Sequence, residues 1–473
     1  MGVLEHLSPK YSHKSVLGQM STSKPKHIVM IVADSLRFDS VYQNGKAGVP
    51  YMEQNSVQFT NVTSPACWTL PATASLFTGK LPHDHQATTR TRFLDKDSAT
   101  LGEILQDQGY KTYQFTSNVA TTEVFGLDRG FDQVLKTWDL AEQKGLKISQ
   151  LFMLLGKHRI RSKLFSKDAI SESLSADLRA GTVWFRSYYK LIFDHAKDVM
   201  DKHEAKGESA FIFINLMETH FPYHIDTEFK FLSKNPFSRL SELKTLFSIV
   251  NQTFLTKDDS IPQDKKLKKI KSRQSKSWEL IRDDLDEFAK AVHQDQDNLV
   301  VFTSDHGENF GDQNWVYHFS NVTDACTRVP LFWLDHNGMT PGINDSKTSS
   351  RLLFHSIAKK AGYDKLNGHD LFNNNIYNIP ISQSYWYNNH GRTLDKYKFN
   401  QFCFHYEGMR YLKKNGHWAK AKVTDYDGLK EESLFERLDK GYNPIEEDVK
   451  DNEVQKYLKE QLEDFLKFEK KIG

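Results

Sequence analysis

The chain has 473 residues, 38% hydrophobic and 26% charged, a composition that excludes disordered, collagen-like and membrane-embedded classes and is enough for one large domain or two. Lysine and arginine (63) nearly balance aspartate and glutamate (61), giving a formal net charge of +2. No global field therefore attracts the protein to nucleic acid or to a membrane surface, and we expect no nucleic acid partner.

Residues 1–25 are interpreted as an N-terminal tail. They contain no apolar run of the kind found in signal peptides, and no later segment approaches the roughly 18 apolar residues of a membrane-spanning helix. We therefore predict a cytoplasmic protein without a transmembrane segment. The three cysteines, Cys67, Cys326 and Cys403, lack the spacing of a metal site, and their odd number favours reduced thiols over disulfides.

Short apolar runs, rich in β-branched residues, predict strands buried on both faces of a sheet. They are Ile28–Val32, Thr112–Thr116, Ala210–Leu216, Leu299–Thr303 and Pro330–Leu334. Helical patterns lie between them, as at Thr100–Gln108 and Trp278–His293. This alternation predicts an α/β fold in which a mostly parallel central sheet is sandwiched by helices.

The α/β domain is predicted over residues 26–375, with helical insertions at about 136–206 and 226–277. A lysine-rich stretch, residues 265–276, is interpreted as a solvated helix or loop face in preference to a polyanion site. From about residue 376, aromatic-rich segments predict a small sheet, and an amphipathic pattern predicts a closing helix. Residues 376–473 are therefore predicted to form a small C-terminal α+β subdomain.

Polar side chains directly follow four of the predicted strands. They are Asp34 after the first, Ser117 and Asn118 after the second, Glu218, Thr219 and His220 after the third, and Asp305 and His306 after the fourth. Ligands bind beyond the carboxyl ends of strands in open sheets, so these residues are expected to meet at one site. The pair Asp305 and His306 offers a hard oxygen and an imidazole nitrogen to a metal ion, and Asp34 is a further candidate ligand.

The segment Trp68–Gly79 predicts a helix that begins near Thr69, has Pro71 in its first turn and ends at Gly79. A hydroxyl at a helix N-terminus lies among unpaired N–H groups, where an oxyanion would be stabilised. On this segment alone, Thr69 is interpreted as a helix cap in preference to a nucleophile. A metal ion nearby would favour the nucleophile, because it lowers the pKa of a coordinated hydroxyl.

Taken in order, these segments resemble the alkaline phosphatase/sulfatase superfamily, and within it the proteins usually labelled sulfatases. The similar segments are Ile28–Asp39, Cys67–His85, Thr100–Asp132, Leu216–Tyr223, Thr303–Glu308 and Thr327–Leu331. The resemblance implies an alkaline-phosphatase-like fold and makes Asp34, Thr69, Asp305 and His306 metal ligands, with Thr69 also the nucleophile. It implies that His220 and His318 hold the transferred group or protonate the leaving group.

Two alternatives stay open at this point. Asn118 is expected either to contact substrate or to stabilise a turn. His220 and His318 are expected to act on substrate, each with a purely structural role as its alternative.

Departures from the family pattern refine the expected chemistry. A formylglycine sulfatase needs cysteine or serine where Thr69 stands, so this chain is more similar to the phosphodiesterase, phosphonate hydrolase and phosphoglycerol-transferase branches. The second adjacent aspartate of calcium-binding sulfatases is missing beside Asp34, and Leu216 replaces the aspartate of the Asp-x-x-x-His pair of two-zinc members. We therefore expect one divalent metal ion, with Mn, Zn or Mg favoured over Ca.

The resulting hypothesis is a metal-dependent hydrolase or transferase of phosphate or sulfate esters that forms a covalent intermediate on Thr69, with phosphoesters slightly preferred. The expected substrate is a small-molecule, glycan or lipid-head-group ester. One alternative is a sulfatase acting on a sulfated sugar or small molecule, and another is a catalytically silent binding member of the superfamily. Fold alone does not separate these functions.

Overall fold

The protein is described by a computed structural model that covers residues 23–139, 187–221, 223, 264–294, 297–318, 320–337, 340–366, 369–373, 376–385, 399–423 and 435–472. Most of each predicted insertion lies outside these described residues, at 140–186 and 224–263. No helix in the described part of the chain is both long and apolar enough to cross a membrane.

A nine-stranded mixed sheet forms the centre of the fold, with strands in the order β4-β3-β5-β1-β6-β7-β2-β8 and β9 beside β2. The strands are β1 His27–Ala33, β2 Val57–Thr63, β3 Tyr110–Thr116, β4 Gln133–Lys136, β5 Ser209–Leu216, β6 Leu299–Thr303, β7 Arg328–Leu334, β8 Gly342–Asn344 and β9 Thr348–Ser349. The run from β4 to β6 is parallel, and β7 is antiparallel to both of its neighbours. The five predicted strands and the mostly parallel sheet are confirmed, whereas β2 was not predicted.

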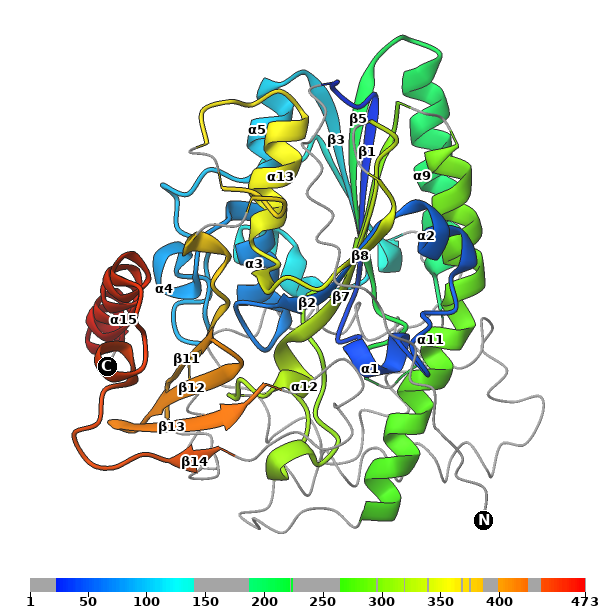
Figure 1. Ribbon diagram of the computed structural model, residues 1–473. Helices are drawn as coiled ribbons and strands as arrows, with labels where there is room; N and C mark the ends of the chain where they lie inside the picture. The colour runs from blue at the N-terminus through cyan, green and yellow to red at the C-terminus, as the bar shows by residue number, and fades with distance from the viewer. Residues whose placement is uncertain are drawn as a thin grey trace, which may run out of the picture.

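Helices cover both faces of this sheet (Figure 1). One layer contains α3 Thr69–Thr78, α5 Leu101–Asp107 and α13 Leu352–Lys360, and the other contains α2 Pro50–Asn55, α9 Tyr189–Glu204 and α11 Asp264–His293. Strand β1 shows why the sheet is covered twice: Ile28, Met30 and Val32 face the first layer, and the residues between them face the second. All are fully buried, so apolar residues occupy every position of the strand after His27.

The predicted helices differ from the observed ones mainly at their starts. Thr100, the first residue of the segment predicted as helical, is the N-cap of α5: its hydroxyl accepts from Glu103 N at 3.2 Å, and the Glu103 carboxylate accepts from Thr100 N at 2.8 Å. The segment predicted at Trp278–His293 is the second half of the longer helix α11. The lysine-rich stretch lies mostly in the first half of α11, with Lys268 and Lys269 exposed, which agrees with a solvated helix face.

Short helices complete the connections. They are α1 Phe38–Val41, α4 Pro82–His85, α12 Asp324–Thr327 and α14 Pro444–Glu447.

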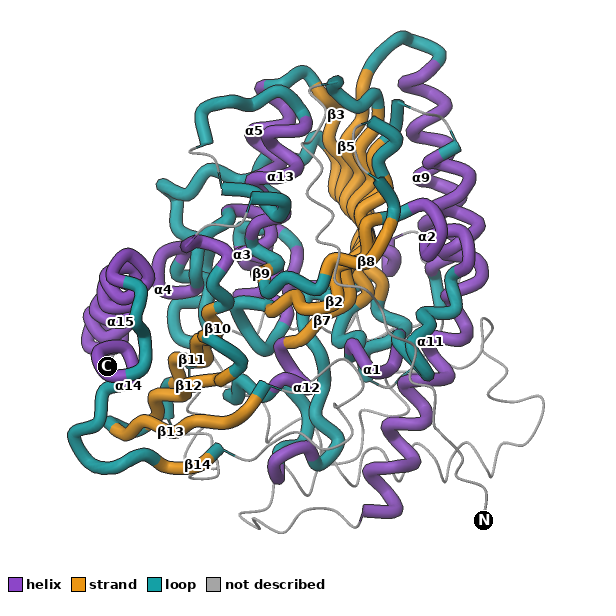
Figure 2. The backbone as a smooth tube through the Cα atoms, in the orientation of Figure 1, coloured by secondary structure: helices purple, strands orange, loops and turns teal. Residues whose placement is uncertain are grey.

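A second, antiparallel sheet lies beside the central one (Figure 2). Its strands, in spatial order, are β10 Ile381–Ser384, β11 Gln401–Tyr406, β12 Met409–Lys414, β13 His417–Lys422 and β14 Glu436–Arg437. The closing helix, α15 Asn452–Ile472, packs Leu458 and Phe465 against Phe402 and Phe404 of β11. The small sheet and closing helix are therefore confirmed, while the domain boundary near residue 376 stays a prediction.

The antiparallel sheet also supports the chain segments that lead to the central sheet's carboxyl edge. Gln383 N donates to Pro65 O at 2.8 Å, and the Ser382 hydroxyl donates to Ser64 O at 2.6 Å. Gln401 Nε2 donates to Ser320 O at 2.5 Å. Pro65 precedes α3 and Ser320 precedes α12, so both segments are anchored from the C-terminal side.

Candidate active site

The predicted site residues converge at the carboxyl ends of β1, β3, β5 and β6. Asp34 follows β1, Asn118 lies two residues after β3, and His220 lies in the turn after β5. Asp305 and His306 follow β6, the direct neighbour of β1. The adjacency of β5, β1 and β6 in the sheet brings residues from 34 to 306 into one cluster.

Three other polar residues at these strand ends have structural partners. The Ser117 hydroxyl accepts from Thr137 Oγ1 at 3.2 Å. Glu218 accepts from the backbone N–H groups of Tyr188 and Tyr189, at 2.9 and 3.1 Å, where α9 begins. The Thr219 hydroxyl donates to the Asp34 carbonyl at 2.7 Å and so braces the backbone of the site.

Asp34, Asp305 and His306 form a fully buried group that can bind a metal ion. One ligand atom from each residue lies within 4.8 Å of the other two, and His306 Nε2 is 3.4 Å from Asp305 Oδ2. That oxygen is buried and has no hydrogen-bond partner among the described residues. Because a buried, unpaired carboxylate oxygen is costly, a cation fits this set of two carboxylates and one imidazole.

The electrostatics of the pair of carboxylates agree with this assignment. Burial and the neighbouring Asp34 raise the pKa of the Asp305 carboxyl well above its usual range. Burial acts in the same direction on Asp34, but His220 and His306 outweigh it and lower the pKa of Asp34. Two carboxylates so close together repel each other, and a cation between them would remove the repulsion.

Ser35 connects the two carboxylates through a left-handed backbone conformation. Its φ angle is 60°, which is uncommon for a residue other than glycine. In this conformation its N–H donates to Asp305 Oδ1 at 3.1 Å, and its hydroxyl donates to Asp34 Oδ1 at 3.0 Å. The strained turn therefore holds both acids in position.

Thr69 is the first residue of α3 and is not its cap, so the interpretation from the segment alone was wrong. The N-cap is Trp68, without a side-chain hydrogen bond, and Gly79 ends the helix at a φ of 68° as predicted. The side chain of Thr69 nevertheless reaches the residues at the strand ends. Its hydroxyl lies 3.2 Å from Asp34 Oδ2 and 3.4 Å from His306 Nε2.

Asn118 stabilises a turn and also reaches the site. Its side-chain oxygen accepts from Ala120 N at 2.8 Å. Its amide nitrogen donates to Asp34 Oδ2 at 2.7 Å and lies 3.3 Å from Thr69 Oγ1. The turn-stabilising role is confirmed, and a contact with substrate stays a prediction.

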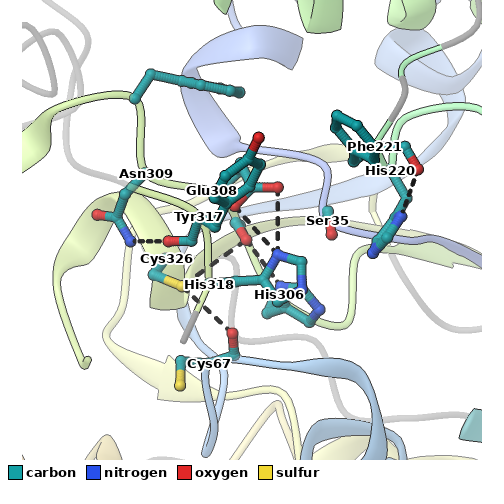
Figure 3. Close-up of polar contacts among 12 residues, drawn as sticks. Ser35, Cys67, His220, Phe221, His306, Glu308, Asn309, Tyr317, His318 and Cys326 are labelled. Atoms are coloured by element: carbon teal, nitrogen blue, oxygen red, sulfur yellow. Dashed lines mark hydrogen bonds and ion pairs between the residues drawn. The ribbon is translucent and has the colours of Figure 1, made fainter. Parts of the chain in front are cut away.

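Three imidazole rings, those of His220, His306 and His318, lie close together at this site (Figure 3). The ring centroid of His318 is 4.6 Å from that of His306 and 5.3 Å from that of His220. His220 Nδ1 lies 2.8 Å from the Phe221 carbonyl oxygen, which can only accept, so Nδ1 carries the hydrogen. The structure thus places both predicted substrate-side histidines next to the possible metal ligands.

Glu308 is a member of this cluster to which the sequence assigned no role. Its side chain is fully buried, its two oxygens lie 3.1 and 3.2 Å from His318 Nδ1, and one accepts from the Tyr223 hydroxyl at 3.0 Å. Burial raises the pKa of Glu308 to about 7. Burial and the neighbouring histidines His306 and His220 hold the pKa of His318 well below its usual range.

Comparisons with known proteins agree with this fold. A family model described as Sulfatase matches residues 26–363, whereas no curated protein matches significantly. Among solved structures, a phosphonate monoester hydrolase from Silicibacter pomeroyi aligns with a TM-score of 0.57 at 15% identity, over 86% of this chain and 90% of its own.

Two further solved structures are similar over comparable lengths. The protein BT4656, in complex with its substrate D-glucosamine-2-N,6-O-disulfate, aligns with a TM-score of 0.55 at 10% identity, over 84% of this chain and 91% of its own. A protein of the alkaline phosphatase superfamily from Vibrio parahaemolyticus gives 0.53 at 14% identity, over 92% and 87%. At these identities the likeness concerns the fold, and it confirms the predicted alkaline-phosphatase-like architecture.

Proposed function

The chain belongs to the sulfatase family, and from this premise we propose that it hydrolyses or transfers phosphate or sulfate esters through a covalent intermediate on Thr69, with phosphoesters slightly preferred. One observation carries the proposal: the Thr69 hydroxyl lies at the start of α3, within hydrogen-bond distance of Asp34 and His306 of the buried metal-binding group.

Thr69 Oγ1 is the proposed nucleophile. The hydroxyl donates to Asp34 Oδ2 at 3.2 Å, and that oxygen is the atom to which its proton would pass. Attack forms a bond from Oγ1 to phosphorus or sulfur and breaks the bond to the leaving oxygen. The N-terminus of α3 would stabilise the charge that develops on the transferred group.

A divalent ion held by Asp34, Asp305 and His306 would lower the pKa of the Thr69 hydroxyl and neutralise charge on the transferred group. Among the residues that the structure describes, the donor set consists of two carboxylates and an imidazole besides that hydroxyl. Calcium takes six to eight oxygen ligands, so we propose Mn, Zn or Mg as the ion.

The substrate side of the site is formed by His220, His318 and Asn118. We propose that the Asn118 amide, which lies 3.3 Å from Thr69 Oγ1, contacts an oxygen of the transferred group, and that the two imidazoles contact the remaining oxygens and the leaving group. Water or an acceptor alcohol then attacks the ester on Thr69 and restores its hydroxyl.

The preference for phosphorus over sulfur rests on the side chain of residue 69. Formylglycine is made by oxidation of cysteine or serine, so Thr69 keeps its plain hydroxyl. Cys67, the nearest thiol in the sequence, is buried with its Sγ 3.6 Å from Ser384 Oγ, on the side of the antiparallel sheet. The alternative is cleavage of a sulfated sugar or small molecule, and the substrate class and cytoplasmic location stay predictions.

A matched panel of esters tests the proposal. The purified protein would be stripped with a chelator, reloaded with Mn or Zn, and assayed on 4-nitrophenyl phosphate, a phosphodiester, a phosphonate monoester and 4-nitrophenyl sulfate. We expect metal-dependent cleavage of one phosphorus ester class, lost in Thr69→Ala and kept in part in Thr69→Ser. Cleavage of the sulfate alone would support the sulfatase alternative, and full activity of Thr69→Ala would contradict the proposal.

A further inference from the structure

The backbone of Glu308, in the loop after β6, is hydrogen-bonded on both sides. Its backbone N–H donates to Ala325 O at 3.1 Å, and its carbonyl accepts from Arg37 Nη1 at 2.6 Å. The Arg37 guanidinium is itself fully buried and paired with Asp39 and Asp312, at 2.6 and 2.7 Å. The carboxyl group of Glu308 therefore projects from a backbone fixed on both sides.

That carboxyl group faces one nitrogen of His318. Nδ1 lies 3.1 and 3.2 Å from the two oxygens of Glu308, as the dashed lines in Figure 3 show. Whether the shared hydrogen resides on Nδ1 or on the carboxyl group, Nδ1 is engaged by Glu308. Nε2 is then the ring atom through which His318 exchanges a proton with substrate.

The same carboxyl group is tied to the segment that carries His220. Glu308 Oε2 accepts from the Tyr223 hydroxyl at 3.0 Å, and Tyr223 N donates to the His220 carbonyl at 2.7 Å. Tyr223 has a φ angle of 58°, so a strained turn directs its side chain toward Glu308. One buried acid thus links both histidines on the substrate side of the site.

We propose that Glu308 is a positioning residue that directs Nε2 of His318 toward the leaving group and so makes His318 the general acid of the first step and the general base of the second. This inference rests on the proposed function, with Thr69 as nucleophile. Before the first step the Glu308–His318 pair shares one proton more than a carboxylate and a neutral imidazole, so that Nε2 carries a hydrogen, and the leaving oxygen takes this proton as its bond to phosphorus or sulfur breaks. In the second step, water attacks the Thr69 ester and gives a proton to Nε2, while the released Thr69 Oγ1 takes back the proton held by Asp34.

A catalytic role of the Glu308–His318 contact differs from a purely structural one in how strongly catalysis depends on the leaving group. Protonation by His318 matters for a poor leaving group such as phenolate and hardly for 4-nitrophenolate, which departs unaided. If Glu308 acts through His318, removing its carboxyl group must lower kcat/KM more for a phenyl ester than for a 4-nitrophenyl ester. A carboxylate that only stabilises the fold would affect every substrate equally.

The experiment compares kcat/KM for phenyl and 4-nitrophenyl esters of the ester class that the enzyme cleaves. Glu308→Gln keeps the shape of the side chain and removes the carboxyl group. We expect a loss of about 100-fold on the phenyl ester and less than about tenfold on the 4-nitrophenyl ester, since general acid catalysis contributes about 10²- to 10⁴-fold. The same loss should appear in His318→Ala, and the double variant should be no worse than His318→Ala.

Asp286→Asn is the matched control. Asp286 is also a buried carboxylate, but it accepts from the N–H groups of Tyr51 and Met52, both at 2.9 Å, at the start of α2. This variant should lower the melting temperature without changing the ratio of the two kcat/KM values. Glu308→Asp, which retains a shorter carboxylate, should recover part of the activity on the phenyl ester.

The outcomes separate this inference from the proposed function. An equal loss on both esters in Glu308→Gln, or losses that add in the double variant, would overturn the role of Glu308 while Thr69→Ala remains inactive. Activity retained in Thr69→Ala would instead remove the premise of a covalent intermediate. A melting temperature measured for each variant identifies one that fails to fold, and in that case Glu308→Asp provides the comparison.

Discussion

Replacing Asp305 by asparagine should have opposite effects on the metal-free and metal-loaded protein. One ligand atom of Asp305 lies within 4.8 Å of one from Asp34, and both side chains are fully buried. At an effective dielectric constant of about 20, two negative charges at this separation would repel by about 3 kcal/mol. The metal-free protein bears this cost either as repulsion or as proton uptake by Asp305, whose pKa is raised by burial and by Asp34. Asparagine removes this repulsion and keeps a carbonyl oxygen to accept from Ser35 N.

The expected melting temperatures of the metal-free and the metal-loaded protein follow from this repulsion. For a chain of 473 residues, the melting temperature shifts by roughly 1 °C per kcal/mol, because the entropy of unfolding scales with length. Asp305→Asn should therefore melt about 3 °C above the wild type after chelator treatment. Metal at about a thousand times its dissociation constant stabilises the native wild type by about 4 kcal/mol, a gain that the variant should lose.

Differential scanning calorimetry of both proteins, with chelator and with a series of manganese or zinc concentrations, measures these shifts. The wild type should gain stability with metal concentration, and the curve of Asp305→Asn should stay flat. Two results would refute the reasoning: a metal-dependent shift equal to that of the wild type, or a metal-free variant that melts well below the wild type. Asp286→Asn serves as the control and should respond to metal like the wild type.

Three further predictions concern parts of the fold around the site. Burial lowers the pKa of His85 to about 3 and those of His293 and His405 to about 4. Because the unfolded chain takes up these protons first, stability is nearly full above about pH 7.5 and falls with increasing slope below it, reaching about 4 kcal/mol per pH unit between about pH 5.5 and 5. Urea denaturation at several pH values would detect this fall, and a flat profile down to pH 5 would contradict it. Gly307→Ala places a Cβ 2.1 Å from the Ala325 carbonyl oxygen. This clash should cost about 1–3 kcal/mol of stability and weaken metal binding, measured by titration. A variant that binds metal normally would show that this loop moves freely. Thr100→Ala removes the capping box of α5 and should lower the free energy of unfolding, measured by denaturation, by about 1 kcal/mol. The value of kcat/KM should stay unchanged. A change in kcat/KM would show that α5 is coupled to the site.

The sequence was most informative where a strand is buried on both sides. In β1, each residue from Ile28 to Ala33 packs in one of two helical layers, and an unbroken apolar run follows from that environment. Strand β2 lies in the same sheet, yet it contains Gln58, Thr60 and Asn61, which interrupt the apolar pattern. The first half of α11 was predicted only as a solvated helix or loop because its lysines outnumber the buried Leu267 and Ile270.

Within the site, the strand order predicts which residues at strand ends lie close together, whereas contacts made by the tertiary fold alone could not be predicted. Asp34, Asp305 and His306 follow predicted parallel strands, so their proximity could be inferred. Whether Thr69 caps α3 or opens it depends on a shift of a single residue, which local propensities do not resolve.

Glu308 illustrates the limit more clearly. One partner, His318, is ten residues away and the other, Tyr223, is 85 residues away. The loop sequence gives no sign of either contact, because the fold alone brings these segments together. The carboxylate could be recognised as part of the site only after both partners were placed around it.

The central claim, that Thr69 carries the transferred group, is tested most directly by trapping the intermediate. The metal-loaded protein would be mixed with an isotopically labelled substrate, quenched in acid within milliseconds, digested and analysed by mass spectrometry. The account predicts label on the peptide containing Thr69, dependent on metal and missing from Thr69→Ala. Label on a different residue, or turnover of Thr69→Ala at the wild-type rate, would contradict it.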